Sequence, residues 1–327
     1  MDVAIKVIYN VALLFIMMIP GILLKKCKLS TDGIGKGISN LVLYIAQPAL
    51  IFLAYLRPFD KEILINSAYV LALSVVAHLI FSVVAMNCFR KSPDSARRML
   101  RFATIFSNAA FMGIPLISAV LEETYPGATV YASIYNITFN LFLWSLGVYI
   151  CTDKRDVNEN GVEDDVDHIQ KGSSPLKALY HPVTIAAAIG RIVFIFPIEG
   201  YVPEIITEAC TMLKNLVAPM SMVVIGLRLA DMKFKGAFKD GAMYVFILLR
   251  HVALPLAVLG VTKLVGLLVE IPDVVQMVVV IMAAAPAATS ATMFAEKYDC
   301  DADYVSRLVT ISTLISIVTM PLILLLV

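Results

Sequence analysis

The chain has 327 residues, of which 60% are hydrophobic and 16% are charged, and its mean hydropathy is +0.85. A soluble domain carries roughly 45–50% apolar and about 25% charged residues, so this composition excludes a soluble protein. The 26 Lys and Arg against 25 Asp and Glu leave a net charge of +1, which does not indicate a nucleic-acid partner. The sequence therefore predicts an all-α polytopic protein embedded in a lipid bilayer.

Ten stretches are long and apolar enough to cross a membrane, because a spanning helix needs about 20 mostly apolar residues. They cover residues 4–24, 36–56, 63–89, 98–121, 128–150, 179–197, 204–228, 241–268, 273–295 and 304–326. The first ends in Lys25-Lys26 and lacks a small-x-small cleavage site, so we expect a retained helix and not a signal peptide. The one long connection, 151–177, is predicted to be an acidic linker between units 1–150 and 178–327.

The lysines and arginines are distributed unequally between the two sets of connections. Nineteen fall after the odd-numbered stretches, and three (Lys6, Arg57 and Lys61) fall on the opposite side. Cytoplasmic loops of membrane proteins carry the excess of these residues. We therefore expect the long connection to be cytoplasmic and both termini to lie outside, in a multi-pass protein of the cell (plasma) membrane.

A weak internal repeat relates the two halves of the chain. A shift of 173 positions superposes residues 123–125 on 296–298 and Tyr131 on Tyr304, which pairs the fourth and fifth stretches with the ninth and tenth. Units of five helices must have opposite topology, because five is an odd number. Two inverted five-helix repeats are typical of secondary transporters with a binding site near the membrane midplane.

The fourth and ninth stretches each carry a predicted interruption. Gly113 and Pro115 disfavour a continuous fourth helix, with Pro115 suited to the first turn of a restarting half-helix, and Pro286 breaks the ninth. The start of a half-helix presents unpaired N–H groups and a partial positive charge. Two such ends that cross in the membrane would form an anion site. Ordinary proline kinks are the alternative interpretation.

The residues at these interruptions resemble the auxin efflux carrier family of membrane transporters. The segment Asn-Ala-Ala-Phe-Met-Gly-Ile-Pro-Leu at 108–116 is similar to the signature of that family's fourth helix. The resemblance continues at Pro286 with 294–298, at 213–229 with Pro219 and Gly226, and at Arg250 with Pro255. It implies ten helices in a scaffold domain and a transport domain, and a crossover site for a carboxylate that includes Asn108. Plant carriers have Gln-Gly and a second proline where this chain has Ala287-Ala288 and Ala291, so the resemblance does not specify auxin.

The candidate substrate-binding residues are mostly uncharged, since a charge at membrane depth costs several kcal/mol. We expect Asn108, Thr289 and Ser290 to bind the carboxylate, with Pro115 and Pro286 shaping the crossover. The full candidate set is Gln47, Asn108, Gly113, Pro115, Lys214, Arg250, Pro286, Thr289, Ser290 and Thr292. Packing of helices through small polar residues is the competing account of the uncharged members.

Four ionisable residues within the predicted spans have two interpretations each. Arg250 would neutralise an anionic substrate or snorkel to the interface, and Lys214 would lie near the substrate path or have no such role. His78 and His251 would carry a coupled proton or be hydrogen-bonded structural histidines. No Asp or Glu lies at the centre of a predicted helix, which disfavours an antiporter with a buried carboxylate pair.

These features predict a secondary carrier that exports a small organic acid by alternating access. One negative charge leaving a negative-inside cell releases about 2.3 kcal/mol per 100 mV. The alternative is a sodium- or proton-coupled organic-anion symporter of the same architecture. A receptor would need an output domain that 27 linker residues cannot supply, and an intramembrane enzyme would need a catalytic arrangement that the sequence lacks.

No cofactor, metal or nucleic acid is expected. The five cysteines are scattered without a CxxC pair, and the glycine-rich segment 33–37 lacks the spacing and the Ser or Thr of a phosphate-binding loop. The sequence leaves open which carboxylate is carried, the coupling ion, and whether the carrier forms a homodimer.

Overall fold

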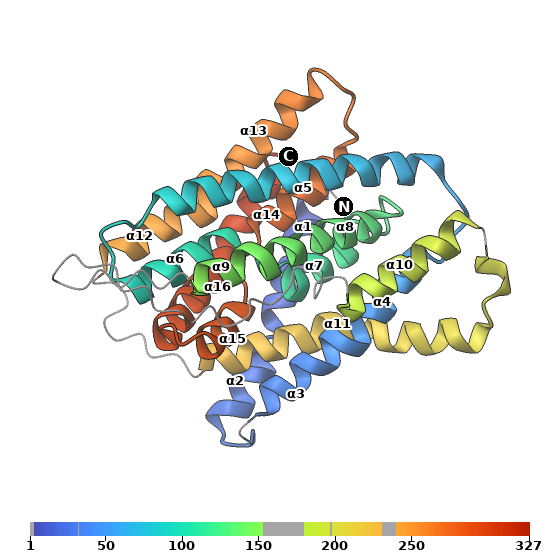
Figure 1. The fold of residues 1–327 in the computed structure, drawn as a ribbon. Coiled ribbons are helices and arrows are strands. Elements are labelled where there is room, and N and C mark those ends of the chain that lie inside the picture. The colour runs from blue at the N-terminus through green and yellow to red at the C-terminus, as the bar shows by residue number, and fades with distance from the viewer. Residues whose placement is uncertain (1–2, 32, 153–179, 197, 231–239) are drawn as a thin grey trace.

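The computed structural model describes residues 3–31, 33–152, 180–196, 198–230 and 240–327 (Figure 1). This part of the chain is helical, and its only strand-like feature is an isolated bridge between Ser107 and Ala287. Apart from its first two residues, the predicted 151–177 linker lies outside the described residues. In chain order the helices are α1 (Val3–Ile16), α2 (Ile19–Lys26), α3 (Ile34–Leu41), η1 (Val42–Ala46), α4 (Gln47–Tyr55), α5 (Lys61–Asn87), α6 (Asp94–Ile105), η2 (Ala109–Gly113), α7 (Ile114–Val120), α8 (Ala128–Phe142), η3 (Leu143–Gly147), α9 (Val148–Thr152), α10 (Pro182–Ile195), η5 (Glu199–Tyr201), α11 (Glu204–Ala230), α12 (Gly241–Leu248), η7 (Leu249–Ala253), α13 (Leu254–Gly266), α14 (Asp273–Ala284), α15 (Ser290–Lys297) and α16 (Ala302–Leu324).

Within the described residues, seven helical stretches are long and apolar enough to cross a membrane. They are Tyr9–Lys26, Ile34–Tyr55, Lys61–Asn87, Ala128–Thr152, Glu204–Ala230, Gly241–Gly266 and Ala302–Leu324. The other three predicted stretches hold shorter helices. Stretch 98–121 contains α6, η2 and α7, stretch 179–197 contains α10, and stretch 273–295 contains α14 and α15. The prediction of an all-helical protein with several membrane-spanning helices is confirmed.

Three helices widen into a π-helical turn shortly before a proline. The turns η1, η2 and η7 run directly into α4, α7 and α13, whose second residues are Pro48, Pro115 and Pro255. Proline has no N–H to donate, and its ring crowds the carbonyl four residues earlier. A π turn places that carbonyl differently and so lets the helix continue past the proline.

The helices pack as two groups (Figure 1). One group contains α2, α3, α4, α10 and α11, with α11 lying along α2 and α4. The other contains α5 to α9 and α12 to α16, with α14 in contact with α5, α8, α13 and α16. The first helix, α1, contacts α11 of one group and α7 and α16 of the other. The region where the two groups meet holds the candidate site.

Candidate functional site

Two broken helices cross at residues 106–108 and 286–288. The first break separates α6 from η2, and the second separates α14 from α15. The backbone N–H of Asn108 donates to the carbonyl of Pro286 at 2.7 Å, and the N–H of Ala288 donates to the carbonyl of Phe106 at 2.8 Å. Lipid offers no partner to a backbone polar group, so this reciprocal pair satisfies groups that the breaks would leave unpaired.

The first break lies earlier in the chain than the sequence predicted. Gly113 and Pro115 were expected to interrupt the helix, but they lie in the part that restarts after Asn108. Pro115 is the second residue of α7, but η2 runs directly into α7, so the half-helix restarts at Ala109 and Pro115 does not lie in its first turn. Gly113 allows close packing on α14, since a Cβ there would lie 2.6 Å from Sδ of Met282. The first break lies at residues 106–108, where the backbone bonds to the other broken helix, and no helix-breaking residue marks this position.

Arg250 binds the ends of both half-helices that stop at the crossing. Its guanidinium donates to the carbonyls of Thr104 (3.3 Å), Ala283 (3.0 Å) and Ala285. Thr104 belongs to the last turn of α6, and the two alanines lie at the end of α14. A helix C-terminus carries unpaired carbonyls and partial negative charge. Arg250 is fully buried, so it does not snorkel, and it holds the crossing together electrostatically.

The two intramembrane histidines are hydrogen-bonded within the protein. Nε2 of His251 lies 2.8 Å from the hydroxyl of Ser312, and that hydroxyl accepts from the backbone N–H of Ala287 at 2.8 Å. Nδ1 of His78 lies 2.7 Å from the carbonyl of Ser74, and its ring stacks on Phe142 at 5.0 Å between centroids. His251 therefore supports the second break through Ser312.

A cavity of about 150 Å³ lies beside the crossing. Its walls come from both helix groups: α3, η1 and α4, the first break with η2, α8 with η3, the start of α10, the end of α11, and the start of α15. Apolar and aromatic side chains form much of the wall, among them Leu43, Phe111, Phe139, Leu143, Trp144, Met293 and Phe294. An apolar wall with a few placed polar groups is the usual composition of a small-molecule site.

Of the predicted substrate-binding residues, Gln47, Asn108, Thr289 and Ser290 line this cavity. The Thr289 hydroxyl donates to Oδ1 of Asn108 at 3.4 Å, and the Gln47 amide donates to the carbonyl of Ala110. Ser290 is the first residue of α15, so the positive end of that half-helix faces the cavity. The residues predicted to bind the carboxylate thus lie together.

The other predicted residues lie outside the cavity lining. Lys214 is half-buried on α11, and Arg250 binds carbonyls at the crossing without lining the cavity. Thr292 lies just behind the wall, where its hydroxyl donates to the carbonyl of Thr289 at 3.0 Å. Pro286 contributes its carbonyl to the crossing.

Arg228 supplies a positive charge to the cavity that the sequence interpretation missed. Its Nη1 donates to the carbonyl of Thr289 at 2.6 Å and to the hydroxyl of Thr292 at 2.8 Å. No carboxylate in the described part of the chain forms an ion pair with it. The prediction ended the seventh helix at residue 228 and placed this arginine in a loop, whereas α11 continues to Ala230.

Several buried polar atoms on the cavity wall have no hydrogen-bond partner. They are Oε1 of Gln47, Oγ of Ser107, Nδ2 of Asn108, Oδ1 of Asn136 and Oγ of Ser290. An unsatisfied buried polar atom costs about 1–3 kcal/mol, so a cluster of them indicates a site that is completed by water or a ligand. Asn136 and Asn140 both line the cavity and lie one helical turn apart on α8, a spacing that the sequence already contained.

The protein is polytopic and helical, and two broken helices cross beside a cavity with polar residues in its wall. This is the architecture of a membrane transporter. The comparison with protein families agrees with this class. The model of the family described as membrane transport protein matches residues 6–324. The chain therefore belongs to this family, which is the auxin efflux and bile acid carrier family that the sequence resembled.

Proposed function

We propose that the chain is a secondary carrier that exports a small carboxylate across the plasma membrane by alternating access. The observation that carries the proposal is that two donors line one cavity: Arg228, which forms no ion pair with a carboxylate among the described residues, and the amide Nδ2 of Asn108, which has no hydrogen-bond partner. A guanidinium and an amide N–H are the donors that a carboxylate requires. The apolar wall would hold the rest of the acid.

The proposal assigns the chain ten membrane helices in two inverted five-helix units, 1–150 and 178–327. The reciprocal bonds at the crossing support this, because each break gives one N–H and one carbonyl to the other. Such equivalence is what two units related by a two-fold axis in the membrane plane would produce. With both termini outside, α9 and α10 are joined in the cytoplasm.

Alternating access requires the two helix groups to move relative to one another. Arg228 belongs to α11 in one group, and its partners Thr289 and Thr292 belong to the other. The movement would therefore break these bonds, and a bound carboxylate would replace them as the partner of Arg228. A ligand can shift such an equilibrium only by binding one state better than the other.

Export is favoured by the position of the cavity. Ser39, His181 and Arg228 line it; Ser39 lies near the start of the continuous helical stretch Ile34–Tyr55, His181 directly precedes α10, and Arg228 lies near the end of α11. By the distribution of lysine and arginine, these ends are cytoplasmic. An acid would thus enter from the cytoplasm, and the membrane potential would drive its negative charge outward by about 2.3 kcal/mol per 100 mV.

The test is charge movement across proteoliposomes on addition of a panel of mono- and dicarboxylates. We expect a current for one class of acid. Arg228→Met should raise the half-saturating concentration about ten- to hundredfold, since a hydrogen bond to a charged group contributes about 1.5–3 kcal/mol. Asn108→Ala should raise it about fivefold, as expected for a neutral hydrogen bond of about 1 kcal/mol.

Lys214→Met is the matched control, because Lys214 is a half-buried cation on the same helix outside the cavity lining. An equal loss in Lys214→Met and Arg228→Met would contradict the proposed site. A current that depends on an imposed sodium or proton gradient would instead favour the coupled symporter. Transport with unchanged affinity in both Arg228→Met and Asn108→Ala would refute the cavity as the binding site.

A further inference from the structure

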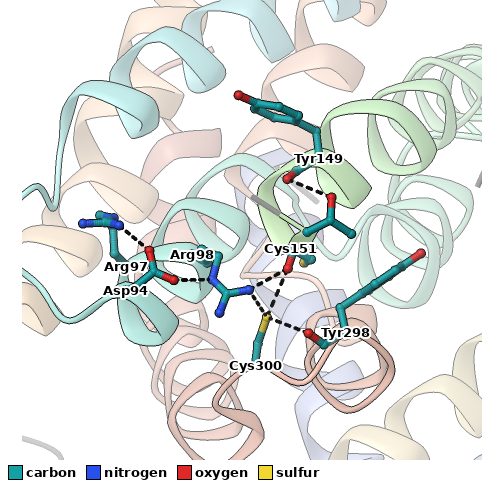
Figure 2. A network of polar contacts seen from close by, with 8 residues as sticks. Asp94, Arg97, Arg98, Tyr149, Cys151, Tyr298 and Cys300 are labelled. Carbon is teal, nitrogen blue, oxygen red and sulfur yellow. Dashed lines mark hydrogen bonds and ion pairs between the residues drawn. The ribbon is translucent and has the colours of Figure 1, made fainter. Parts of the chain in front are cut away.

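Two cysteines that are far apart in the sequence lie close together in the fold (Figure 2). Cys151 is in the last turn of α9, and Cys300 is in the turn between α15 and α16. Sγ of Cys300 lies 3.7 Å from the carbonyl oxygen of Cys151, and the two thiols are close enough to interact electrostatically. Both cysteines are reduced in this structure.

A buried arginine lies against this pair. Nη1 of Arg98 donates to the carbonyl of Cys151 at 2.6 Å and to Sγ of Cys300 at 3.3 Å. Nε of Arg98 forms an ion pair with Asp94 at 2.9 Å, and Arg97 pairs with the same carboxylate. Two guanidinium groups thus share one carboxylate, and Arg98 presents a cationic N–H to the sulfur of Cys300, which Asp299 and Asp301 flank in the sequence. A neighbouring cation favours the thiolate, the reactive form of cysteine.

The two cysteines differ in accessibility. Cys300 is partly exposed, whereas Cys151 is buried at 0% relative exposure. A small oxidant would therefore reach Cys300 first, and Cys151 would meet only the oxidised form of its neighbour. An accessible thiolate next to a second thiol is the arrangement of redox-sensitive cysteine pairs.

We propose that Cys300 and Cys151 are a peroxide-reactive dithiol. The Cys300 thiolate attacks a hydroperoxide, so that an S–O bond forms, the O–O bond breaks, and an alcohol or water leaves after taking a proton. The Cys151 sulfur then attacks the Cys300 sulfenic acid; the S–S bond forms, the S–O bond breaks, and the hydroxide leaves as water with the Cys151 proton. Two thiols and one hydroperoxide thus give one disulfide, one alcohol or water, and one further water.

The disulfide would join the end of α9 to the turn after α15. Because α15 begins at the cavity with Ser290, the bond would fix the far end of the half-helix that contributes to the cavity wall. By the charge distribution, this end of the bundle is cytoplasmic. Disulfides formed in that reducing compartment are usually transient and redox-sensing.

The first test exposes the purified full chain, in a lipid nanodisc, to hydrogen peroxide, then alkylates free thiols and maps peptides by mass. We expect a linked pair of peptides containing Cys151 and Cys300, with Cys27, Cys88 and Cys210 still alkylated. Cys151→Ser should stop the reaction at a Cys300 sulfenic acid that a diketone probe traps. Equal oxidation of all five cysteines, or a Cys300 that stays reduced, would overturn the proposal.

The second test measures how fast Cys300 is alkylated near pH 7 in arginine variants. Arg98→Met should slow it about tenfold, the change in thiolate fraction for one unit of pKa, while Arg98→Lys should retain most of the rate. Arg97→Met is the matched control, because Arg97 binds the same Asp94 without contacting sulfur. An equal effect of Arg97→Met and Arg98→Met would refute activation by Arg98, and the Arg98→Lys variant guards against a folding defect.

Discussion

The crossing of the broken helices and the crossing of α2 with α11 are two close backbone contacts built in opposite ways. At the first, residues 106–108 and 286–288 exchange backbone hydrogen bonds beside a cavity with unsatisfied polar atoms. At the second, Gly21 and Gly226 leave no space: a Cβ on either would lie 2.1 Å from a carbonyl oxygen of the facing helix. Intact helices satisfy their own backbone and need only small residues to pack. Broken helices need partners from elsewhere, and here each broken helix supplies them to the other.

The largest expected effect comes from removing the arginine that holds the first crossing. Arg250→Met leaves carbonyls of Thr104, Ala283 and Ala285 without this donor, and each buried unsatisfied group costs about 1–3 kcal/mol. We expect a large fall in thermal stability in detergent together with loss of transport. The thermal stability of Arg250→Lys should lie between that of the unchanged protein and that of Arg250→Met, since one ammonium cannot span both helix ends as a planar guanidinium does. A stable Arg250→Met would show that the crossing does not depend on this charge.

The next effect concerns the glycine contact. Gly226→Ala places a methyl group 2.1 Å from the carbonyl oxygen of Met18, and a backbone atom cannot rotate away as a side chain can. Overpacking costs typically about 1–3 kcal/mol, so the melting temperature should fall. Gly260→Ala is the control, because its Cβ meets nothing within 4 Å and should leave stability unchanged or slightly higher. Equal melting temperatures for the two variants would contradict the close contact between α2 and α11.

The sequence predicted the helical membrane fold well because hydropathy over about 20 residues reports directly on the requirement of the bilayer. The sequence also predicted that Asn108 and Thr289 would act at one site, because Pro286 marks the second break, and the two side chains are hydrogen-bonded to each other. It misplaced the first break because residues 106–108 contain no helix breaker; their conformation depends on hydrogen bonds to a segment about 180 residues away. Arg228 was missed for a related reason. A charged residue at a predicted helix end reads as a loop residue, and only the fold turns it toward the cavity.

The smallest expected change in stability comes from replacing a single buried asparagine, and it distinguishes the polar wall of the cavity from ordinary buried polar groups. Oδ1 of Asn136 has no partner, whereas the buried amide of Asn66 donates to the hydroxyl of Tyr131 at 3.2 Å. Asn136→Leu removes an unsatisfied group, so stability should stay the same or rise by about 1 kcal/mol while transport falls. Asn66→Leu removes a made hydrogen bond, so stability should fall by about 1 kcal/mol while transport per folded molecule is retained.

Thermal unfolding and initial transport rates, normalised to folded protein, distinguish the two outcomes. If Asn136→Leu lost stability and kept transport, the wall would be a structural polar cluster like that around Asn66. If both variants lost transport, the effect would lie in the movement of α8 against α5, which pack together, and not in the cavity. The expected opposite responses would show that the protein keeps its least satisfied polar groups where a substrate satisfies them, and the well-packed α2–α11 contact offers no such place.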